Sequence, residues 1–260
     1  MSSSPNGPVG LEQQFLGWLR QINLRLEELT HLQRIALLGD ERIFEFLWQD
    51  HRIRFFLPNV SSDLIQRYIL NTSTFFEINL LSRFGRYVSE STVVVDAGAN
   101  IGNHSVYFAK ICGAQRIYAF EPLRETFSVL EKNIALNAPE RVICHNLALG
   151  AGFGRAGIAQ YFGNNIGATQ LASRVDGAYE VRPLDSFGFE RIDAFKIDVE
   201  GYEVAVLEGA RESLARCKPV IFIEILPEAG QRPHEFLVAL GYERAETLGD
   251  RDFIYLPKKA

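Results

Sequence analysis

Acidic residues stand at the ends of three segments of this sequence that have the composition of β-strands. Asp96 ends a run of three valines, Glu121 ends the segment RIYAFE, and Asp198 follows the stretch FKI. Such β-branched and apolar runs are typical of strands that are covered on both faces of a parallel sheet. Because ligands bind outside the carboxyl ends of these strands, we expect the three carboxylates to surround a ligand.

A glycine-rich turn follows the first strand, in the stretch DAGANIG between Asp96 and Gly102. Gly98 and Gly102 supply a tight turn that lets the backbone approach a ligand closely, although many proteins use such a turn merely to reverse direction. The spacing D-x-G-x-x-x-G differs from the G-x-G-x-x-G that brings a pyrophosphate onto a helix N-terminus. A carboxylate above the ligand suits a cofactor that carries an ammonium group and no phosphate. S-adenosylmethionine is such a cofactor.

The end of the second strand strengthens this interpretation. Glu121 and Pro122 follow Asp96 by about 25 residues, close to the spacing at which dinucleotide folds place the acid that binds ribose hydroxyls. A carboxylate at that point also disfavours a 2′-phosphate. Asp96 and Glu121 together therefore predict a site for a nucleoside cofactor.

Three charged residues alternate at the end of the strand expected at 192–199. They are Lys196, Asp198 and Glu200. A period of two places them on one side, although the turn after Asp198 interrupts the alternation. Glu224 ends the next apolar strand, where a lone carboxylate is costly unless it is paired. These groups could share protons at one locus and activate a hydroxyl acceptor. Their structural alternatives are charge neutralisation of Asp198 by Lys196 and a favourable helix start at Glu200.

Two further possibilities concern the same site. His104, at the start of the helix after the glycine turn, is a candidate base, or it hydrogen-bonds the cofactor carboxylate or the end of the sheet. Asp198 and Glu224 could instead hold Mg²⁺, which would lower the pKa of an acceptor hydroxyl. Two carboxylates do not make a metal signature, so Mg²⁺ is possible but not favoured and no metal ligand is assigned.

Composition excludes several classes of protein. The chain has 260 residues, of which 47% are hydrophobic and 23% are charged, as in an ordinary soluble globular protein. A formal net charge of −5 argues against a general nucleic-acid binder. No apolar run of about 18 residues and no secretory signal are present, so we expect no membrane span. Cys112, Cys144 and Cys217 lack a C-x-x-C spacing and indicate reduced cysteines in a cytoplasmic protein.

Three parts of the chain differ in pattern. Residues 1–40 contain an amphipathic helix, or two with a break, whose apolar stripe at 11–38 either packs on the main domain or forms a homodimer contact. Residues 41–90 form an accessory segment with a small hairpin and a helix that starts after Asp63. In this segment Glu77 could reach the site but is better explained as a solvated residue at a helix start.

Residues 91–260 alternate strands and helices, which is typical of an α/β sheet. Strands are expected at 92–96, 116–121, 142–149, 179–184, 192–199 and 220–225, and an antiparallel hairpin at 242–256 ends the chain. Residues 150–157 are expected to be a glycine-rich loop. The polar insert 161–178 reads as a lid or binding loop, with Asn164, Asn165 and Thr169 as candidate substrate contacts.

Four ordered blocks carry a resemblance: VVVDAGANIGNHSVYFAK, AFEPLRETFSVLEKNIALN, RPLDSF and FKIDVEGYEVAVLEGA. Together they resemble the FkbM family of S-adenosylmethionine-dependent methyltransferases over roughly residues 75–225. The resemblance implies a class I methyltransferase fold, which is a Rossmann-like, mostly parallel seven-stranded sheet with helices on both faces and a C-terminal antiparallel hairpin. It also implies O-methylation of sugar, glycan, glycolipid or polyketide hydroxyls. The residues predicted to contact the cofactor are Asp96, Gly98, Asn100, Ile101, Gly102, Glu121, Pro122 and Asp198.

Two other functions stay open at this point. A nicotinamide-dependent oxidoreductase would share the strand, the turn and Glu121, but the G-x-G-x-x-G motif is missing. Tyr255 and Lys259 have Y-x-x-x-K spacing, yet Pro257 between them denies the helix that this motif needs. A non-catalytic cofactor-binding or scaffold protein on the same fold is the second alternative.

Overall fold

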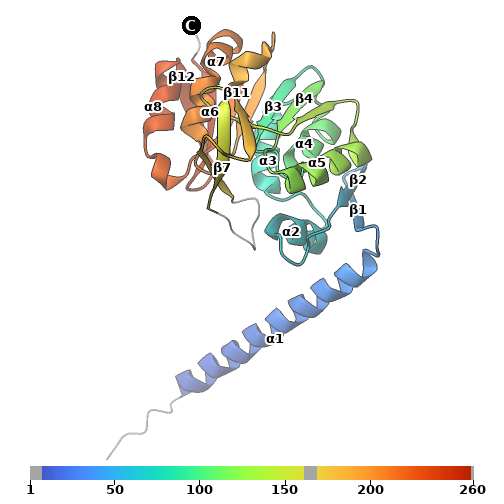
Figure 1. The fold of residues 1–260 in the computed structure, drawn as a ribbon. Coiled ribbons are helices and arrows are strands. Elements are labelled where there is room, and N and C mark those ends of the chain that lie inside the picture. The colour runs from blue at the N-terminus through green and yellow to red at the C-terminus, as the bar shows by residue number, and fades with distance from the viewer. Residues whose placement is uncertain (1–7, 161–168, 259–260) are drawn as a thin grey trace, which may run out of the picture.

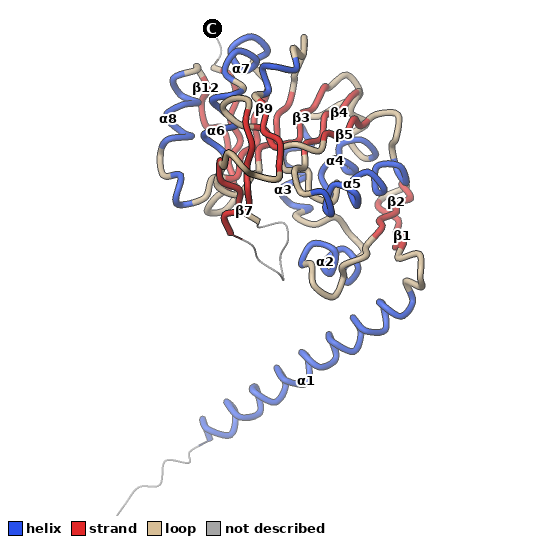
Figure 2. The backbone as a smooth tube through the Cα atoms, in the orientation of Figure 1, coloured by secondary structure: helices blue, strands red, loops and turns tan. Residues whose placement is uncertain are grey.

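A seven-stranded sheet organises the protein, and the computed structural model describes residues 8–160 and 169–258 (Figures 1 and 2). Its strands, from one edge to the other, are β12 (Tyr242–Thr247), β13 (Asp252–Pro257), β11 (Val220–Glu224), β10 (Ala194–Ile197), β3 (Val93–Ala97), β4 (Arg116–Phe120) and β5 (Val142–His145). The strands from β11 to β5 are parallel, and β13 runs antiparallel to β11 and β12. The predicted fold class is therefore confirmed.

Alternating residues of the central strand belong to two separate cores. Val94 packs in a cluster with residues of α4 (Asn103–Lys110) and α5 (Arg124–Asn137). Val95 packs in a second cluster with residues of α6 (Glu203–Gly209), α7 (Arg211–Cys217) and α8 (Arg232–Ala239). Because successive side chains of a strand point to opposite faces, helices cover both faces of the sheet. This burial explains the uninterrupted valines of β3.

The segment before β3 adds a hairpin and two short helices to the first core. Strands β1 (Ile43–Trp48) and β2 (His51–Phe56) form the predicted hairpin, which is tied to α5 by a hydrogen bond from the Phe56 N–H to Asn133 Oδ1. Helix α2 (Leu64–Thr72) is capped as predicted, since the Asp63 carboxylate accepts the N–H of Gln66. Helix α3 (Ile78–Phe84) then leads through a short 3-10 helix (Gly85–Tyr87) to the sheet.

The N-terminal helix is one uninterrupted element, α1 (Pro8–Leu37), so of the two expected forms the structure has the single helix. Figure 1 shows α1 projecting away from the rest of the protein, with α2 beside its C-terminal end. Over the described parts of the chain, we find no helix with the length and apolar character that crossing a membrane requires.

A second, four-stranded sheet replaces part of the expected loop region, and this prediction was wrong. Its strands, in spatial order, are β6 (Ala148–Leu149), β9 (Tyr179–Arg182), β7 (Gly154–Gln160) and β8 (Gln170–Ser173). The expected strand at 142–149 is divided between the two sheets. Glycines that suggested a loop instead allow close packing, because a Cβ on Gly177 would lie 2.2 Å from the carbonyl oxygen of Ala156. Asn164 and Asn165 lie outside the described residues.

Candidate functional site

The glycine turn after β3 is shaped by contacts within the protein. Gly98 has φ +75°, and a Cβ there would lie 1.7 Å from the carbonyl oxygen of Asp198. Gly102 has φ +87°, and its Cβ would lie 2.8 Å from Leu130 Cδ1. Both glycines therefore permit the turn to pack on β10 and on α5, in a conformation that residues with a Cβ rarely adopt. Gly98 also lines both cavities described below, so the expected close approach of the backbone to a ligand stays a prediction for this residue.

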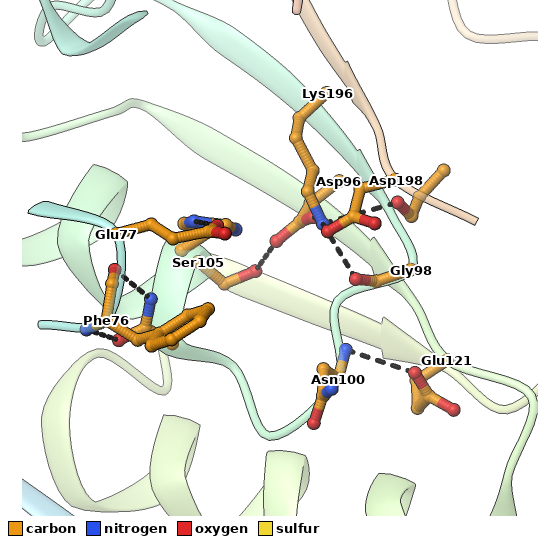
Figure 3. A network of polar contacts seen from close by, with 12 residues as sticks. Phe76, Glu77, Asp96, Gly98, Asn100, Ser105, Glu121, Lys196 and Asp198 are labelled. Carbon is orange, nitrogen blue, oxygen red and sulfur yellow. Dashed lines mark hydrogen bonds and ion pairs between the residues drawn. The ribbon is translucent and has the colours of Figure 1, made fainter. Parts of the chain in front are cut away.

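Asp96 is a buried support of the turn (Figure 3). Its side chain is fully buried, accepts a hydrogen bond from Ser105 Oγ at 2.6 Å, and lies 3.2 Å from Lys196 Nζ. Asp96 lines neither of the two cavities described below, and the same is true of Ile101 and Gly102. These contacts indicate that Asp96 holds Lys196 and Ser105 beneath the turn, and its predicted direct contact with a cofactor stays a prediction.

Lys196 connects this support to the acidic end of β10. Its ammonium group lies 3.3 Å from Asp198 Oδ2 and donates a hydrogen bond to the Gly98 carbonyl oxygen at 2.7 Å. Burial disfavours the charged ammonium, but the carboxylates of Asp198 and Asp96 outweigh this effect and raise the pKa of Lys196. Lys196 therefore keeps its proton and cannot act as a base. This geometry favours the structural alternative for Lys196, neutralisation of Asp198, over the predicted catalytic part in sharing protons.

Glu121 stands at the end of β4 with both carboxylate oxygens aligned by the backbone. The Asn100 N–H donates to Oε2 at 3.0 Å and the Leu123 N–H donates to Oε1 at 2.8 Å. Burial raises the pKa of Glu121 to about 7, and these two backbone hydrogen bonds oppose the rise. Asn100 itself has φ +51°, which places its N–H toward Glu121. The turn and the second strand are thus joined at this carboxylate.

Glu121 lines a cavity of about 670 Å³, including the part open to solvent, which we call the first cavity. Its walls are mostly apolar, with carboxylates from three residues. No lysine or arginine of the described chain lines it. Its lining residues are Gly98, Asn100, Phe120, Glu121, Pro122, Leu123, Thr126, Leu147, Ala148, Leu149, Thr169, Leu171, Asp198, Val199, Glu200 and Tyr202. Thr169 and Leu171 come from the region expected to form a lid.

A second cavity of about 740 Å³, again including open solvent, adjoins the first. The two share the walls formed by Gly98, Asn100, Asp198 and Glu200. The other residues that line it come from six segments far apart in the sequence: Leu64, Ile65, Phe76, Glu77, Ala99, Asn103, His104, Lys196, Glu224 and Arg251. Two ligands bound in these cavities would therefore meet at the acidic end of β10.

Asp198, Glu200 and Glu224 converge where the cavities meet, as predicted. One carboxylate oxygen of each lies within 4.8 Å of the others. Burial and the charge of Asp198 raise the pKa of Glu224 to about 9, so Glu224 is protonated at neutral pH and hydrogen-bonds Asp198. Although burial opposes it, the charge of Lys196 lowers the pKa of Asp198, which stays ionised. Burial and the charge of Asp198 raise the pKa of Glu200 to about 7.

The proton held by Glu224 makes stability depend on pH. An unfolded glutamate loses its proton near 4.5, whereas folded Glu224 keeps it up to about 9. The folded state therefore binds more protons between these values, and the free energy of unfolding should fall as pH rises through this window. Between pH 7.5 and 8.5, after Glu200 and Glu121 have titrated, we expect Glu224→Gln to reduce this fall in urea denaturation. One titrating group accounts for at most about 1.4 kcal/mol per pH unit.

The matched control for this measurement is Glu243→Gln, which removes an exposed carboxylate on β12. It should leave the fall in stability between pH 7.5 and 8.5 as large as in the wild type. An equal slope in wild type and Glu224→Gln would show that Glu224 does not carry the proton.

His104 lies in the second cavity next to a residue that the sequence did not favour. Its Nε2 is 3.5 Å from Glu77 Oε2. Glu77 has φ +56° and follows Phe76, whose N–H and carbonyl oxygen both hydrogen-bond the Asn103 side chain at 3.0 Å (Figure 3). This clamp holds Glu77 beside α4 and the cavity. Glu77 is therefore more than a solvated residue at a helix start.

Two residues of the C-terminal hairpin also join the site, and sequence reasoning missed both. Arg251 Nε lies 3.4 Å from Glu224 Oε1. Asp252 pairs with Glu224 in the register of β11 and β13, and burial together with the charge of Glu77 raises the pKa of Asp252 to about 6. The signal available in the sequence was their position in LGDRD, the turn of the hairpin between β12 and β13, since β13 pairs with the strand that carries Glu224.

Comparisons with known proteins agree with this architecture. The model of the Methyltransferase FkbM domain matches residues 96–254. Methyltransferase sdnD of Sordaria araneosa is 31% identical in an alignment 178 residues long, which covers 54% of this chain and 68% of that protein. Hexuronic acid methyltransferase AglP of Haloferax volcanii is 27% identical over 165 residues, covering 61% of this chain and 65% of that protein.

A solved structure extends the comparison to three dimensions. The crystal structure of Methyltransferase FkbM from Methylobacillus flagellatus KT matches with a TM-score of 0.47 and 22% identity. The match covers 65% of this chain but 44% of the crystallised one, so this chain corresponds to less than half of that protein. Because the family model covers more than half of this sequence and includes Asp96, Glu121, Asp198 and Glu224, the chain belongs to the FkbM family of methyltransferases.

Proposed function

We propose that the protein transfers a methyl group from S-adenosylmethionine to a hydroxyl oxygen of a sugar, a glycan or glycolipid, or a polyketide-type small molecule. The observation that carries this proposal is the pair of adjoining cavities that share the walls formed by Gly98, Asn100, Asp198 and Glu200. The first cavity combines apolar walls with carboxylates, as expected of a site for a nucleoside cofactor. The second cavity is polar, and Glu200, the proposed base, lines both.

The first cavity fits S-adenosylmethionine better than a nicotinamide dinucleotide. Carboxylates of Glu121, Asp198 and Glu200 line it without a lysine or arginine among the described residues, which suits a cationic cofactor and disfavours a pyrophosphate. Each oxygen of Glu121 accepts one backbone hydrogen bond and has a second lone pair for a ribose hydroxyl. When bound, the cofactor supplies an electrophilic methyl group on a sulfonium.

The second cavity supports a hydroxyl acceptor. A hydroxyl is a weak nucleophile while it is protonated, so a base must take its proton as the new bond forms. Glu200 lines both cavities, and its pKa of about 7 suits a base that works at neutral pH. Protonated Glu224 donates to Asp198 and thereby keeps a second negative charge away from Glu200. His104, held beside Glu77, is a second candidate base in this cavity.

The acceptor class rests on the lining of the second cavity and on one relative. Carboxylates and the Asn103 amide can hydrogen-bond several hydroxyl groups, and Phe76 offers an apolar wall to the face of a sugar ring. The relative AglP is a hexuronic acid methyltransferase, so its name gives a sugar as the acceptor. These features support a hydroxyl-rich acceptor.

Calorimetric titration with S-adenosylhomocysteine, in parallel with NAD, tests the cofactor. We expect saturable binding of S-adenosylhomocysteine alone. Glu121→Ala should weaken it about 10- to 100-fold, since a hydrogen bond to a charged group contributes about 1.5–3 kcal/mol. Glu121→Gln, which keeps one side-chain oxygen, should weaken it less. The control Glu131→Ala, an exposed change on α5, should bind as the wild type does.

Binding of NAD in preference to S-adenosylhomocysteine would favour the oxidoreductase alternative, and cofactor binding without turnover on any hydroxyl acceptor would favour a non-catalytic protein. The Mg²⁺ alternative is tested by adding EDTA to the turnover assay. We expect turnover to persist in EDTA. Loss of turnover that Mg²⁺ restores would assign Asp198, Glu200 and Glu224 to a bound cation.

A further inference from the structure

Helix α1 exposes a continuous apolar stripe on one side. At 3.6 residues per turn its members recur at i, i+3, i+4 and i+7, so they share one face of the helix. Their exposed fractions range from 46% to 73%. The stripe consists of Leu11, Phe15, Trp18, Leu19, Ile22, Leu26, Leu29 and Leu32. Leu16 and Leu24 are also exposed but lie on the opposite side of the helix.

Within residues 8–160 and 169–258, the hydrogen bonds between α1 and other elements lie near its C-terminal end. Arg34 Nη1 donates to the Leu70 carbonyl oxygen of α2 and to Ser73 Oγ, and His31 Nδ1 lies 3.0 Å from Asn71 Oδ1. From there α1 projects away from the sheet (Figure 1). Helices draw most of their stability from packing of an apolar face, and the stripe of α1 has no such packing within the described chain. A partner must cover it.

Charge distinguishes the possible partners. A helix that lies on a membrane surface is rich in Lys and Arg on its polar face. Residues 8–37 contain no lysine, and their three arginines are balanced by three glutamates. A surface without net charge and with aromatic residues in its stripe instead fits another protein helix of similar composition.

A second copy of the chain supplies a helix of this kind. It offers an identical stripe, and a two-fold axis lets the same residues of both copies face one another. The stripe extends over residues 11–32, which is about 33 Å at 1.5 Å per residue. Arg25 and Glu28 lie at the edges of the stripe, where charges of opposite sign from the two copies can pair.

We propose that α1 is a dimerisation helix, in which the stripe of Leu11 to Leu32 packs against the same stripe of a second copy of the chain. This proposal does not depend on the proposed function. Neither cavity is lined by a residue of α1. Cofactor binding and methyl transfer can therefore be measured separately from the oligomeric state.

Sedimentation equilibrium of the full chain tests this proposal with two matched variants. We expect a dimer for the wild type, a monomer for Ile22→Glu/Leu29→Glu, and a dimer for Leu16→Glu/Leu24→Glu. Both variants place two glutamates at exposed apolar positions of the same helix, but only the first changes the stripe. Equal thermal unfolding of the folded domain in all three proteins would show that the monomeric mass of a variant does not result from unfolding.

Three results would overturn the proposal. The first is a monomeric wild type, and the second is a dimer that Ile22→Glu/Leu29→Glu leaves intact. The third is a monomer that co-sediments with vesicles of phosphatidylcholine and phosphatidylglycerol and loses this binding in Ile22→Glu/Leu29→Glu, which would assign the stripe to a membrane surface.

Discussion

Replacing Glu200 by Gln should lower kcat/KM about 10²- to 10⁴-fold, which is the usual contribution of a general base. The amide has nearly the same shape as the carboxyl group but cannot accept the acceptor's proton. Among the described residues, the carboxylates that line both cavities are Asp198 and Glu200, and Glu200 is the one of the two whose pKa is raised to about 7. Asp198 is ionised but is held by Lys196, and Glu224 is protonated at neutral pH.

The pH profile of kcat/KM separates a base from a positioning residue. In the wild type, activity should fall as pH drops below about 7, because protonated Glu200 cannot take a proton. Glu200→Gln should keep a small activity that lacks this limb. Glu208→Gln, an exposed change on α6, should behave as the wild type does. If Glu200→Gln instead retained the limb with nearly full activity, the base would be another group, and His104→Gln would be the next variant to measure.

Replacing Lys196 by Met should lower the free energy of unfolding by about 3–5 kcal/mol, as expected when one member of a buried ion pair is removed. Lys196 and Asp96 are fully buried, and the ammonium group is shared between Asp96 and Asp198. Met fills a similar volume, so the loss comes mainly from the uncompensated carboxylates. Urea denaturation at neutral pH measures the effect, with the exposed Lys258→Met as control.

A double variant isolates the charge effect. Asp96→Asn in the Lys196→Met background removes one unpaired carboxylate and should recover part of the lost stability. A loss below about 1 kcal/mol for Lys196→Met, or no recovery in the double variant, would contradict the importance of this buried pair. Lys196 donates a hydrogen bond to the Gly98 carbonyl oxygen. The cofactor affinity of Lys196→Met therefore reports whether the Gly98 turn keeps its conformation, whatever the change in stability.

The main sheet was predictable because its signals are local. Strands β3 and β11 are buried on both faces, and their sequences are therefore uninterrupted apolar runs. Helix α5 is buried on one side, and its apolar residues therefore recur at helical spacing. The second sheet was not predictable in this way. Its strands β7 and β8 carry glycines and polar residues, and their pairing depends on partners brought together by the whole fold.

The same division holds for the site. Sequence alone indicated that Glu121, Asp198, Glu200 and Glu224 stand at one edge of the sheet, since parallel strands bring their carboxyl ends together. Only the tertiary structure decided which of these side chains line a cavity and which carboxylate is protonated. These properties depend on burial and on distances between segments far apart in the chain. For this reason the sequence did not show that Asp96 is buried against Lys196. Nor did it show that Glu77 of the accessory segment lies beside His104, or that Arg251 of the final hairpin lies beside Glu224.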